Sequence, residues 1–300
     1  MGSFSATVKA ELCRTEVGKS CCAMAEALGV LLFSNTFSPE LIRIVTESTD
    51  FSERLPRLFR KAFGLQFDAL TETKQGGKSV CQITDLQKIA RVFELCGFSA
   101  RTSVVLHVNF AVLESDCCRK AFLRGAFLAG GSVTDPHKQY QLELSTTHQR
   151  VSGETQTLMG EMELLPKETQ RKGSHVLYFK QSESIEDFLT SIGAPISAMA
   201  VMQAKIEKDW RNEANRKTNC DTANVMKTVD AAQMQLSALR KLETSGVLHS
   251  LPEKLRQTAL LRFDNPESNL AELAALHDPP ASKSAVNHRM RKLIALSEEE

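Results

Sequence analysis

Apolar and polar residues follow two different periods along the first two thirds of the chain. Helical spacing is found in the stretch Phe51–Gly64 and again in a segment that closes at Gly97, a residue type that commonly ends helices. The stretch Leu41–Ser48 is rich in β-branched residues, and two strand-like segments flank Gln75-Gly76-Gly77-Lys78, a hairpin signature. This pattern predicts helices mixed with antiparallel strands.

The same order of elements occurs a second time. A strand at Tyr140–Thr146 precedes a helix, a hairpin that turns at Lys172-Gly173, and a helix that ends at Gly193. Sliding the chain along itself by 96 residues superimposes the following pairs: Gly29 on Gly125, Gly77 on Gly173, Gly97 on Gly193, Val80 on Val176, Ile83 on Phe179, Ile89 on Ile185 and Phe93 on Leu189. So many matches at one offset indicate a duplicated unit. Two copies are too few for a solenoid, so we expect one domain with pseudo-two-fold symmetry.

Each copy opens with an apolar helix that contains small residues. The second is FLRGAFLAGGSV, Phe122–Val133, and the first is ALGVLLFSN, Ala27–Asn35. Glycine inside a helix costs roughly 0.5–1 kcal/mol relative to alanine, so such glycines usually mark a close contact. An ordinary buried helix is the simpler interpretation. The duplication favours two helices packed against each other at the centre of the domain through Gly29, Gly125 and Ala129.

The pattern changes from Ala194 onward, where strand signals vanish. A long helix is expected from Pro195 through Trp210 and continues as the polar connector RNEANRKTNC, after which another helix follows. That last helix carries one apolar stripe, formed by Val225, Val229, Ala232, Leu236 and Leu239. The connector holds Arg211, Arg216 and Lys217, which belong either to a solvated charged helix or to a surface that contacts phosphate.

The C-terminal segment NLAELAALHDPPASKSAVNHRMRKLIAL predicts two short helices joined by a turn. Asn269, with Glu272 three residues later, has the spacing of a capping box, and Pro279 with Pro280 ends that first helix near His277. Ser282 is expected to cap a final helix that runs to about Ser297. Two helices in this order are typical of a helix-turn-helix, whose second helix enters the major groove of DNA.

The final helix has an apolar side and a basic side. Val286, Met290 and Leu293 recur at helical spacing and are expected to pack inward. The candidate DNA-binding residues are Lys283, Ser284, Asn287, His288, Arg289, Arg291 and Lys292. Asparagine pairs with adenine and arginine with guanine through two hydrogen bonds each, so this side is suited to contacting base edges. The alternative is a solvated basic face on a helix that serves only packing.

Composition narrows the remaining functions. The 300 residues carry a formal charge of +1 and are 42% hydrophobic, which suits two folded domains whose nucleic-acid affinity comes from local patches. The N-terminal segment lacks the apolar core of a signal peptide, and we expect a cytoplasmic protein without a membrane segment. Eight cysteines include vicinal pairs but no C-x-x-C motif, so we expect mostly buried, reduced thiols, no metal site and no cofactor.

The duplicated glycine-containing helices resemble those of the LAGLIDADG homing endonucleases, in which two central helices end in an acidic residue at the cleavage site. Aligning that motif with the two helices places Ser34 and Gly130 at the acidic position. Metal-dependent cleavage of a phosphodiester needs carboxylates to hold the cations, and neither residue supplies one. We therefore expect a nuclease scaffold that has lost its metal site and has no catalytic residue.

The whole chain resembles the WhiA family, bacterial regulators that join a degenerate LAGLIDADG domain to a C-terminal helix-turn-helix. The motifs that carry this resemblance are FLRGAFLAGGSVTDP, the connector RNEANRKTNCDTAN, and SKSAVNHRMRKL. The resemblance implies a sequence-specific DNA-binding transcriptional regulator linked to cell division, chromosome segregation and, in spore formers, sporulation. For such a regulator we expect double-stranded DNA at promoter regions as the partner and a cytoplasmic location at the nucleoid, whereas a nucleoid-associated protein with secondary DNA contact is an alternative.

The expected fold class is therefore α+β, a duplicated LAGLIDADG-like saddle domain followed by an all-α helix-turn-helix domain. The expected divisions are residues 1–110 and 111–200 for the two repeats, 201–222 for a helical connector, and 223–300 for the DNA-binding domain, with the helix-turn-helix at about 268–300. Two other functions stay open. One is an active endonuclease that uses displaced acids such as Asp135, and the other is a scaffold whose saddle binds another regulatory protein while DNA contact is secondary.

Overall fold

The computed structural model describes residues 2–73, 77–98 and 105–299, which form two compact units, Met1–Asp209 and Trp210–Glu300. In the first unit, eight elements make up the N-terminal helix and the first repeat: α1 Phe4–Arg14, α2 Ser20–Leu32, β1 Thr36–Phe37, β2 Ile42–Thr46, α3 Thr49–Phe63, β3 Ala69–Thr73, β4 Lys78–Ile83 and α4 Leu86–Leu95. The second repeat contains η1 Phe110–Val112, α5 Asp116–Gly130, β5 Gly131–Val133, β6 Leu142–Thr146, α6 Gln149–Glu161, β7 Lys167–Arg171, β8 Ser174–Phe179 and α7 Ser182–Ile192.

Both repeats have the same topology. Each forms an antiparallel four-stranded sheet, in the order β1-β2-β4-β3 in the first and β5-β6-β8-β7 in the second. The offset of 96 residues holds for the start of α5 relative to α2, of β8 relative to β4 and of α7 relative to α4, whereas β6 starts 100 residues after β2. The duplicated α+β fold is confirmed, with a longer connection before the second strand in the second copy.

The chain reverses at equivalent glycines in the two repeats. Gly97 and Gly193 follow α4 and α7 with φ of 81° and 100°, a left-handed conformation that ends both helices at little cost. The hairpin between β7 and β8 turns at Lys172 and Gly173, as expected. The corresponding expected turn of the first repeat includes Gln75 and Gly76, which lie outside the described residues.

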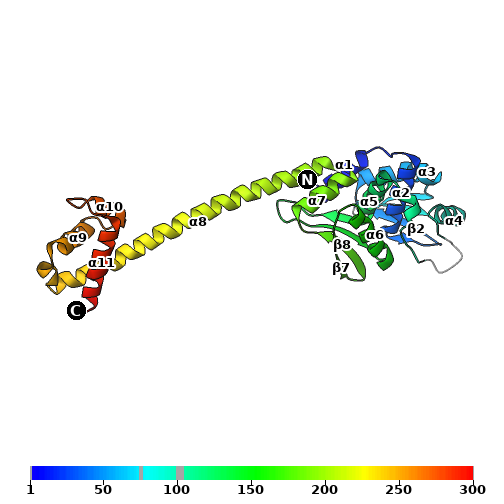
Figure 1. Ribbon diagram of the computed structural model, residues 1–300. Coiled ribbons are helices and arrows are strands. Elements are labelled where there is room, and N and C mark those ends of the chain that lie inside the picture. Colours follow the sequence, from blue (N-terminus) through cyan, green and yellow to red (C-terminus); the bar gives the residue numbers. More distant parts are fainter. Residues whose placement is uncertain (1, 74–76, 99–104, 300) are drawn as a thin grey trace. The chain divides into compact units, whose positions relative to one another are not determined.

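The helices α2 and α5 lie side by side at the centre of the first unit (Figure 1). Their backbones approach closely at two glycines. A Cβ atom on Gly29 would lie 2.1 Å from the carbonyl oxygen of Phe122, and one on Gly125 would lie 2.0 Å from that of Glu26. Ala129 is half-buried and packs against the core. Glycine is therefore required at both positions for this spacing of the helices.

A buried ion pair connects the elements around these helices. Glu26 of α2 and Arg54 of α3 are each 1% exposed, and Glu26 accepts hydrogen bonds from Arg54 Nε and Nη2 at 2.6 and 2.9 Å. Arg54 also donates to the carbonyl oxygens of Cys13, in the last turn of α1, and of Thr15, which follows α1. Arg124 of α5 lies 3.4 Å from Glu26 and donates to the carbonyl of Ile192 at 2.7 Å. This network joins five helices through one carboxylate.

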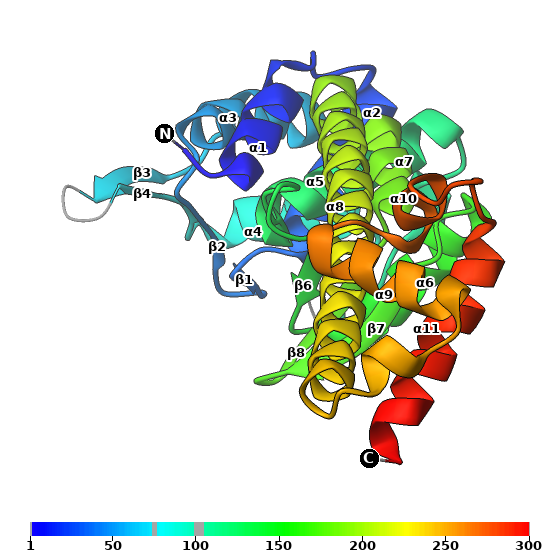
Figure 2. The same ribbon diagram turned by 90° about the vertical axis from the view of Figure 1, so that its left-hand side faces the viewer.

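Three elements of the first unit did not follow from the sequence pattern. The helix α1, which lies beside α3 (Figure 2), buries only Val8, Leu12 and Cys13. The strands β1 and β5 contain two and three residues, which is too short for a recognisable alternation. Each nevertheless forms one edge of its sheet.

The second unit is helical. The elements from the end of the second repeat onward are α8 Pro195–Thr244, η2 Val247–Ser250, α9 Glu253–Asp264, α10 Leu270–Ala275 and α11 Lys283–Glu298. The helices α9, α10 and α11 gather around the C-terminal end of α8 (Figure 1). Their core consists of Leu239, Leu242, Leu248, Leu255, Ala259, Leu273, Ala274, Val286, Met290 and Leu293.

The polar connector is helical, as expected, but the expectation of a separate helix after it was wrong, because α8 continues without interruption for 50 residues. No proline or glycine follows Pro195 within it, so nothing in the connector stops the helix. The expected apolar stripe on its C-terminal part is only partly buried. Val225 and Val229 are 63% and 48% exposed, whereas Leu239 is 1% exposed because α9 to α11 cover the helix there.

The cysteines also differ from the expectation of mostly buried thiols. Four are buried, Cys13, Cys81, Cys96 and Cys118, and the other four are exposed or half-buried. In the described part of the chain, no helix is both long enough and apolar enough to cross a membrane.

Candidate nucleic-acid interface

The two helices of the predicted helix-turn-helix begin at the expected caps. Asn269 Oδ1 accepts hydrogen bonds from the backbone nitrogens of Ala271 and Glu272, and the Glu272 carboxylate accepts one from the Asn269 nitrogen at 2.8 Å. This reciprocal pair is the predicted capping box, which is confirmed. Ser282 Oγ accepts a hydrogen bond from the Ala285 nitrogen at 3.1 Å and starts α11.

The apolar side of α11 fixes the direction in which its polar side faces. Val286 and Leu293 are 0% exposed and Met290 is 1% exposed, within the core that α8, α9 and α10 share. The inward packing of these three residues is therefore confirmed. Because α11 cannot rotate without exposing them, the opposite side of the helix faces solvent.

We define the recognition face as Ser284, His288 and Arg291 on that opposite side, Asn287 and Lys292 at its flanks, and Lys283 at the first position of α11. Five of them are exposed, and Asn287 is half-buried. Among the described residues, Lys283, Arg291 and Lys292 form no ion pair within the protein, and no acidic residue lies between them in the sequence. Their charge is therefore available to a polyanion.

Arg289 has different surroundings. It is half-buried, and its Nη1 donates to Thr258 Oγ1 of α9 over 3.4 Å. Thr258 in turn lies 3.3 Å from Nε2 of His277, which is 4% exposed. Burial, together with the charge of Arg289, lowers the pKa of His277 below its ordinary value. Arg289 therefore packs between α9, α10 and α11, and we leave it out of the recognition face.

A hollow of about 440 Å³ lies beside the start of α11. It is lined by Lys227, Thr228, Ala231, Gln235, Arg262, Asn269, Leu270 and Lys283. Arg262 is 2% exposed and donates to the carbonyl of Ser268 at 2.5 Å, so it holds the loop before α10. Lys227 and Lys283 are exposed cations. Lys227 has no distinguishing signal in the sequence, because only the fold brings it beside Lys283.

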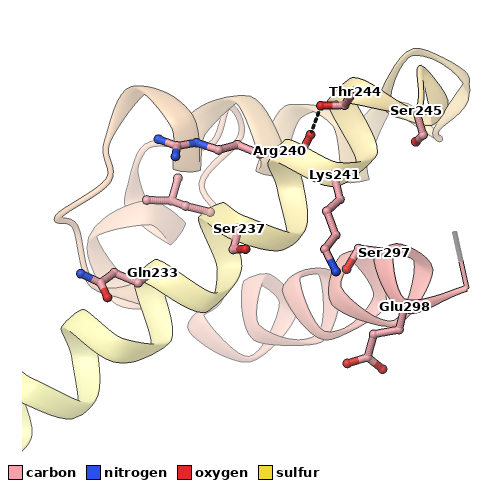
Figure 3. Close-up of a pocket in the computed structure, with 9 residues that line it drawn as sticks. Gln233, Ser237, Arg240, Lys241, Thr244, Ser245, Ser297 and Glu298 are labelled. Carbon is pink, nitrogen blue, oxygen red and sulfur yellow. Dashed lines mark hydrogen bonds between the residues drawn. The ribbon is translucent and has the colours of Figure 1, made fainter.

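A larger hollow, of about 1130 Å³, lies at the other end of α11 (Figure 3). It is lined by Gln233, Leu236, Ser237, Arg240, Lys241, Thr244, Ser245, Ser297 and Glu298. The Lys241 side chain points toward Ser297 (Figure 3). No residue of the recognition face borders it, and it contains an acidic residue beside its two cations. We therefore assign it no part in contacting bases.

The connector cations lie elsewhere on α8. Arg211, Arg216 and Lys217 are all exposed on the surface of that helix. Their expected contact with phosphate stays a prediction.

The positions that correspond to the acidic residues of a LAGLIDADG nuclease lie at the C-terminal ends of α2 and α5. Ser34 follows α2 and donates to the carbonyl of Leu31 at 2.8 Å. Gly130 ends α5, and a Cβ atom there would lie 2.5 Å from the carbonyl oxygen of Ser145. Asp135 accepts a hydrogen bond from the His137 nitrogen at 2.9 Å, as in a turn. These residues do not fit a divalent cation held by carboxylates.

Comparisons with known proteins agree with this architecture. The family model described as "WhiA LAGLIDADG-like domain" matches residues 119–211, and "WhiA C-terminal HTH domain" matches residues 214–297. The proteins named "Probable cell division protein WhiA" from Ruminiclostridium cellulolyticum and Alkaliphilus metalliredigens are 39% and 33% identical to the chain. Each match covers 99% of this chain, with 97% and 98% of the relatives.

The fold has a solved counterpart. The crystal structure of full-length DUF199/WhiA from Thermatoga maritima matches with a TM-score of 0.60 and 22% identity, over 99% of both chains. This likeness shows that the two proteins share the same fold, with corresponding elements in the same order along the chain. With the sequence identity to the relatives over nearly the full length, it leads to one conclusion: the chain belongs to the WhiA family.

Proposed function

We propose that this protein is a sequence-specific DNA-binding regulator of transcription without nuclease activity. The observation that carries the proposal is the division of α11 into a fully buried apolar side and an exposed side of cations and hydrogen-bonding groups. In a helix-turn-helix, the second helix lies in the major groove, where base edges present distinct patterns of donors and acceptors. The name of the relatives, probable cell division protein WhiA, supports a role in cell division.

The residues of the recognition face have separate parts in this proposal. Asn287 and Arg291 have the functional groups that pair with adenine and guanine, and Ser284 and His288 lie on the same exposed side. Lys283 and Lys227 border one hollow at the start of α11 and are proposed to contact the phosphate backbone. Lys292, Arg211, Arg216 and Lys217 are proposed to add further phosphate contacts. Arg289 acts indirectly, by positioning α11.

Binding to the organism's own fragmented genome in the presence of Mg²⁺ tests this proposal. We expect the wild-type protein to enrich a few intact promoter fragments. Arg291→Ala should cost about 1–3 kcal/mol of specific binding and relax the sequence preference. Lys283→Ala should weaken binding to all sequences alike. It should also reduce the slope of the logarithm of the binding constant against the logarithm of the salt concentration by about one.

The matched control is Arg240→Ala, which removes an exposed arginine from the same unit but away from the recognition face. It should leave sequence preference unchanged. An unchanged preference in Arg291→Ala would refute the assignment of the recognition face. Nicked DNA would instead support an endonuclease, and binding without enrichment would support a scaffold or a non-specific nucleoid protein.

Chromosome segregation and, in a spore former, sporulation are the finer roles that we propose, together with a cytoplasmic location at the nucleoid. A DNA ligand supports this location, and overlap of a fluorescent fusion with stained DNA tests it. The LAGLIDADG-like unit is proposed to supply backbone contacts or a surface for another regulatory protein. Substitutions on the surface of that unit distinguish these two roles. Loss of a co-purifying protein with DNA affinity retained would support the protein-binding surface, and loss of DNA affinity would support the backbone contacts.

A further inference from the structure

Two vicinal pairs of cysteines lie at equivalent positions of the two repeats. Cys21 and Cys22 are in the first turn of α2, and Cys117 and Cys118 are in the first turn of α5, 96 residues later. The sulfur atoms of Cys21, Cys22 and Cys118 all lie within 4.8 Å of one another. Cys117 precedes Cys118 in the same turn of α5, next to this group in the chain. The two repeats thus bring four thiols together at one end of the central helices.

The reason for expecting no metal site does not apply to this arrangement. Two adjacent cysteines rarely reach one tetrahedral centre by themselves. Here, however, the second pair comes from a different helix, so the ligands approach one point from two directions. Among the described residues, this is the one group of three or more cysteine, histidine or acidic side chains whose ligand atoms gather so closely.

We propose that this cluster binds a thiophilic cation of the Zn²⁺ class, with Cys21, Cys22 and Cys118 as ligands and Cys117 as the fourth. A tetrahedral zinc site with Zn–S bonds of about 2.3 Å has sulfur atoms about 3.8 Å apart. The separations among the sulfur atoms of Cys21, Cys22 and Cys118 therefore need to close by about 1 Å at most. Each thiol that binds releases its proton to solvent, and the metal keeps its oxidation state.

The surroundings suit a soft cation better than a hard one. All four groups are thiols, and Ca²⁺ or Mg²⁺ would need oxygen ligands. Both pairs lie in the first turn of a helix, so the thiols come from the N-terminal ends of α2 and α5. Cys21 and Cys117 are exposed and Cys118 is buried, so the cluster is open to an ion from solvent on one side.

A disulfide is the competing chemistry, since it also needs close thiols. A disulfide joins two sulfur atoms, whereas three converge here and a fourth thiol, that of Cys117, is adjacent in the chain to Cys118. A bound metal uses all four and connects α2 to α5 at the ends opposite Ser34 and Gly130. The inference is independent of DNA binding, because the cluster lies in the first unit and the recognition face in the second.

The test uses the full-length protein, purified under reducing conditions and loaded with Zn²⁺ or Co²⁺ alone. We expect one zinc per chain by elemental analysis. Co²⁺ should give thiolate charge-transfer absorption together with the intense visible bands of a tetrahedral site. Because loss of even an outer-shell partner reduces metal affinity roughly 10- to 100-fold, Cys21→Ser and Cys118→Ser should each reduce it at least roughly tenfold.

Cys220→Ser is the matched control, because Cys220 is an exposed free cysteine on α8 outside the cluster. It should leave zinc content and the cobalt spectrum unchanged. Cys21 is exposed, so its variant keeps the test valid even where loss of the buried Cys118 thiol impairs folding. Zinc affinity that is the same in the wild type and Cys21→Ser would overturn the proposal. A metal-free wild type with disulfides between the pairs, detected by intact mass, would also overturn it.

Discussion

Replacement of Gly125 by alanine tests the close packing of α2 and α5. The new methyl carbon would lie 2.0 Å from the carbonyl oxygen of Glu26 and 3.0 Å from the backbone nitrogen of Val30. An ordinary contact between carbon and a carbonyl oxygen is about 3.3 Å, so the two backbones must separate by roughly 1.3 Å. No side-chain rotation relieves this clash, because both neighbours are backbone atoms.

Two effects of opposite sign decide the outcome. Alanine is favoured over glycine in a helix by roughly 0.5–1 kcal/mol. Overpacking of a well-packed core typically costs about 1–3 kcal/mol, and a backbone clash at the centre of the unit belongs at the upper end of this range. We therefore expect Gly125→Ala to lower the free energy of unfolding of the first unit by about 2 kcal/mol. Gly153→Ala is the matched control, since Gly153 lies in α6 with open space around its Cβ position, and it should raise stability by roughly 0.5–1 kcal/mol.

Thiol labelling in increasing urea measures this difference for the first unit alone. Cys13, Cys81 and Cys96 are buried in that unit, so each becomes reactive when it unfolds. Mass spectrometry locates the labelled cysteines. A Gly125→Ala midpoint at or above the wild-type midpoint would show that the helices do not approach as closely as described.

Two further predictions concern buried charges. Arg54→Met should destabilise the first unit by about 3–5 kcal/mol, because the buried Glu26 carboxylate loses its main partner. Adding Glu26→Gln should recover part of this loss. Equal urea midpoints for the single and double variants would refute the coupling between the two side chains. The lowered pKa of His277 means that the unfolded chain binds a proton near pH 6.5 while the folded unit does not, so stability of the second unit should fall as pH decreases from about 6.5 toward the lowered folded pKa. His277→Gln should weaken this pH dependence. The urea midpoint of the second unit, followed by NMR signals of α11 at pH 7 and pH 5, measures it. An identical dependence in the variant would show that His277 is not the group responsible.

The parts of the fold that the sequence predicted depend on local patterns. Helical spacing and cap residues correctly oriented α11 and located its start at Ser282, because both are set within a few residues. The repeat offset identified the central helices, although neither has an acidic end. The continuity of α8 was missed because its middle lacks an apolar stripe, yet a helix needs no stripe where no residue breaks it.

Other features depend on contacts between distant segments. Burial of Arg289 against Thr258 cannot be predicted from its place on the helix alone, since it depends on how α9 packs. The same holds for Lys227 beside Lys283. The cysteine cluster did have a signal in the sequence, because Cys21 and Cys117 obey the offset that relates the glycines. Two adjacent cysteines by themselves do not indicate a metal site, because both rarely bind one tetrahedral centre. The site becomes possible only because α2 and α5 bring the two pairs together.

The close contact at Gly130 has an evolutionary consequence. An aspartate introduced there would place its Cβ 2.5 Å from the carbonyl oxygen of Ser145 and 3.1 Å from that of Phe33. One codon change therefore cannot restore the acidic residue of a nuclease in this backbone, because the neighbouring strand must move first. Return of a carboxylate at this position therefore needs at least two coordinated changes, one that shifts the strand and one that replaces the glycine.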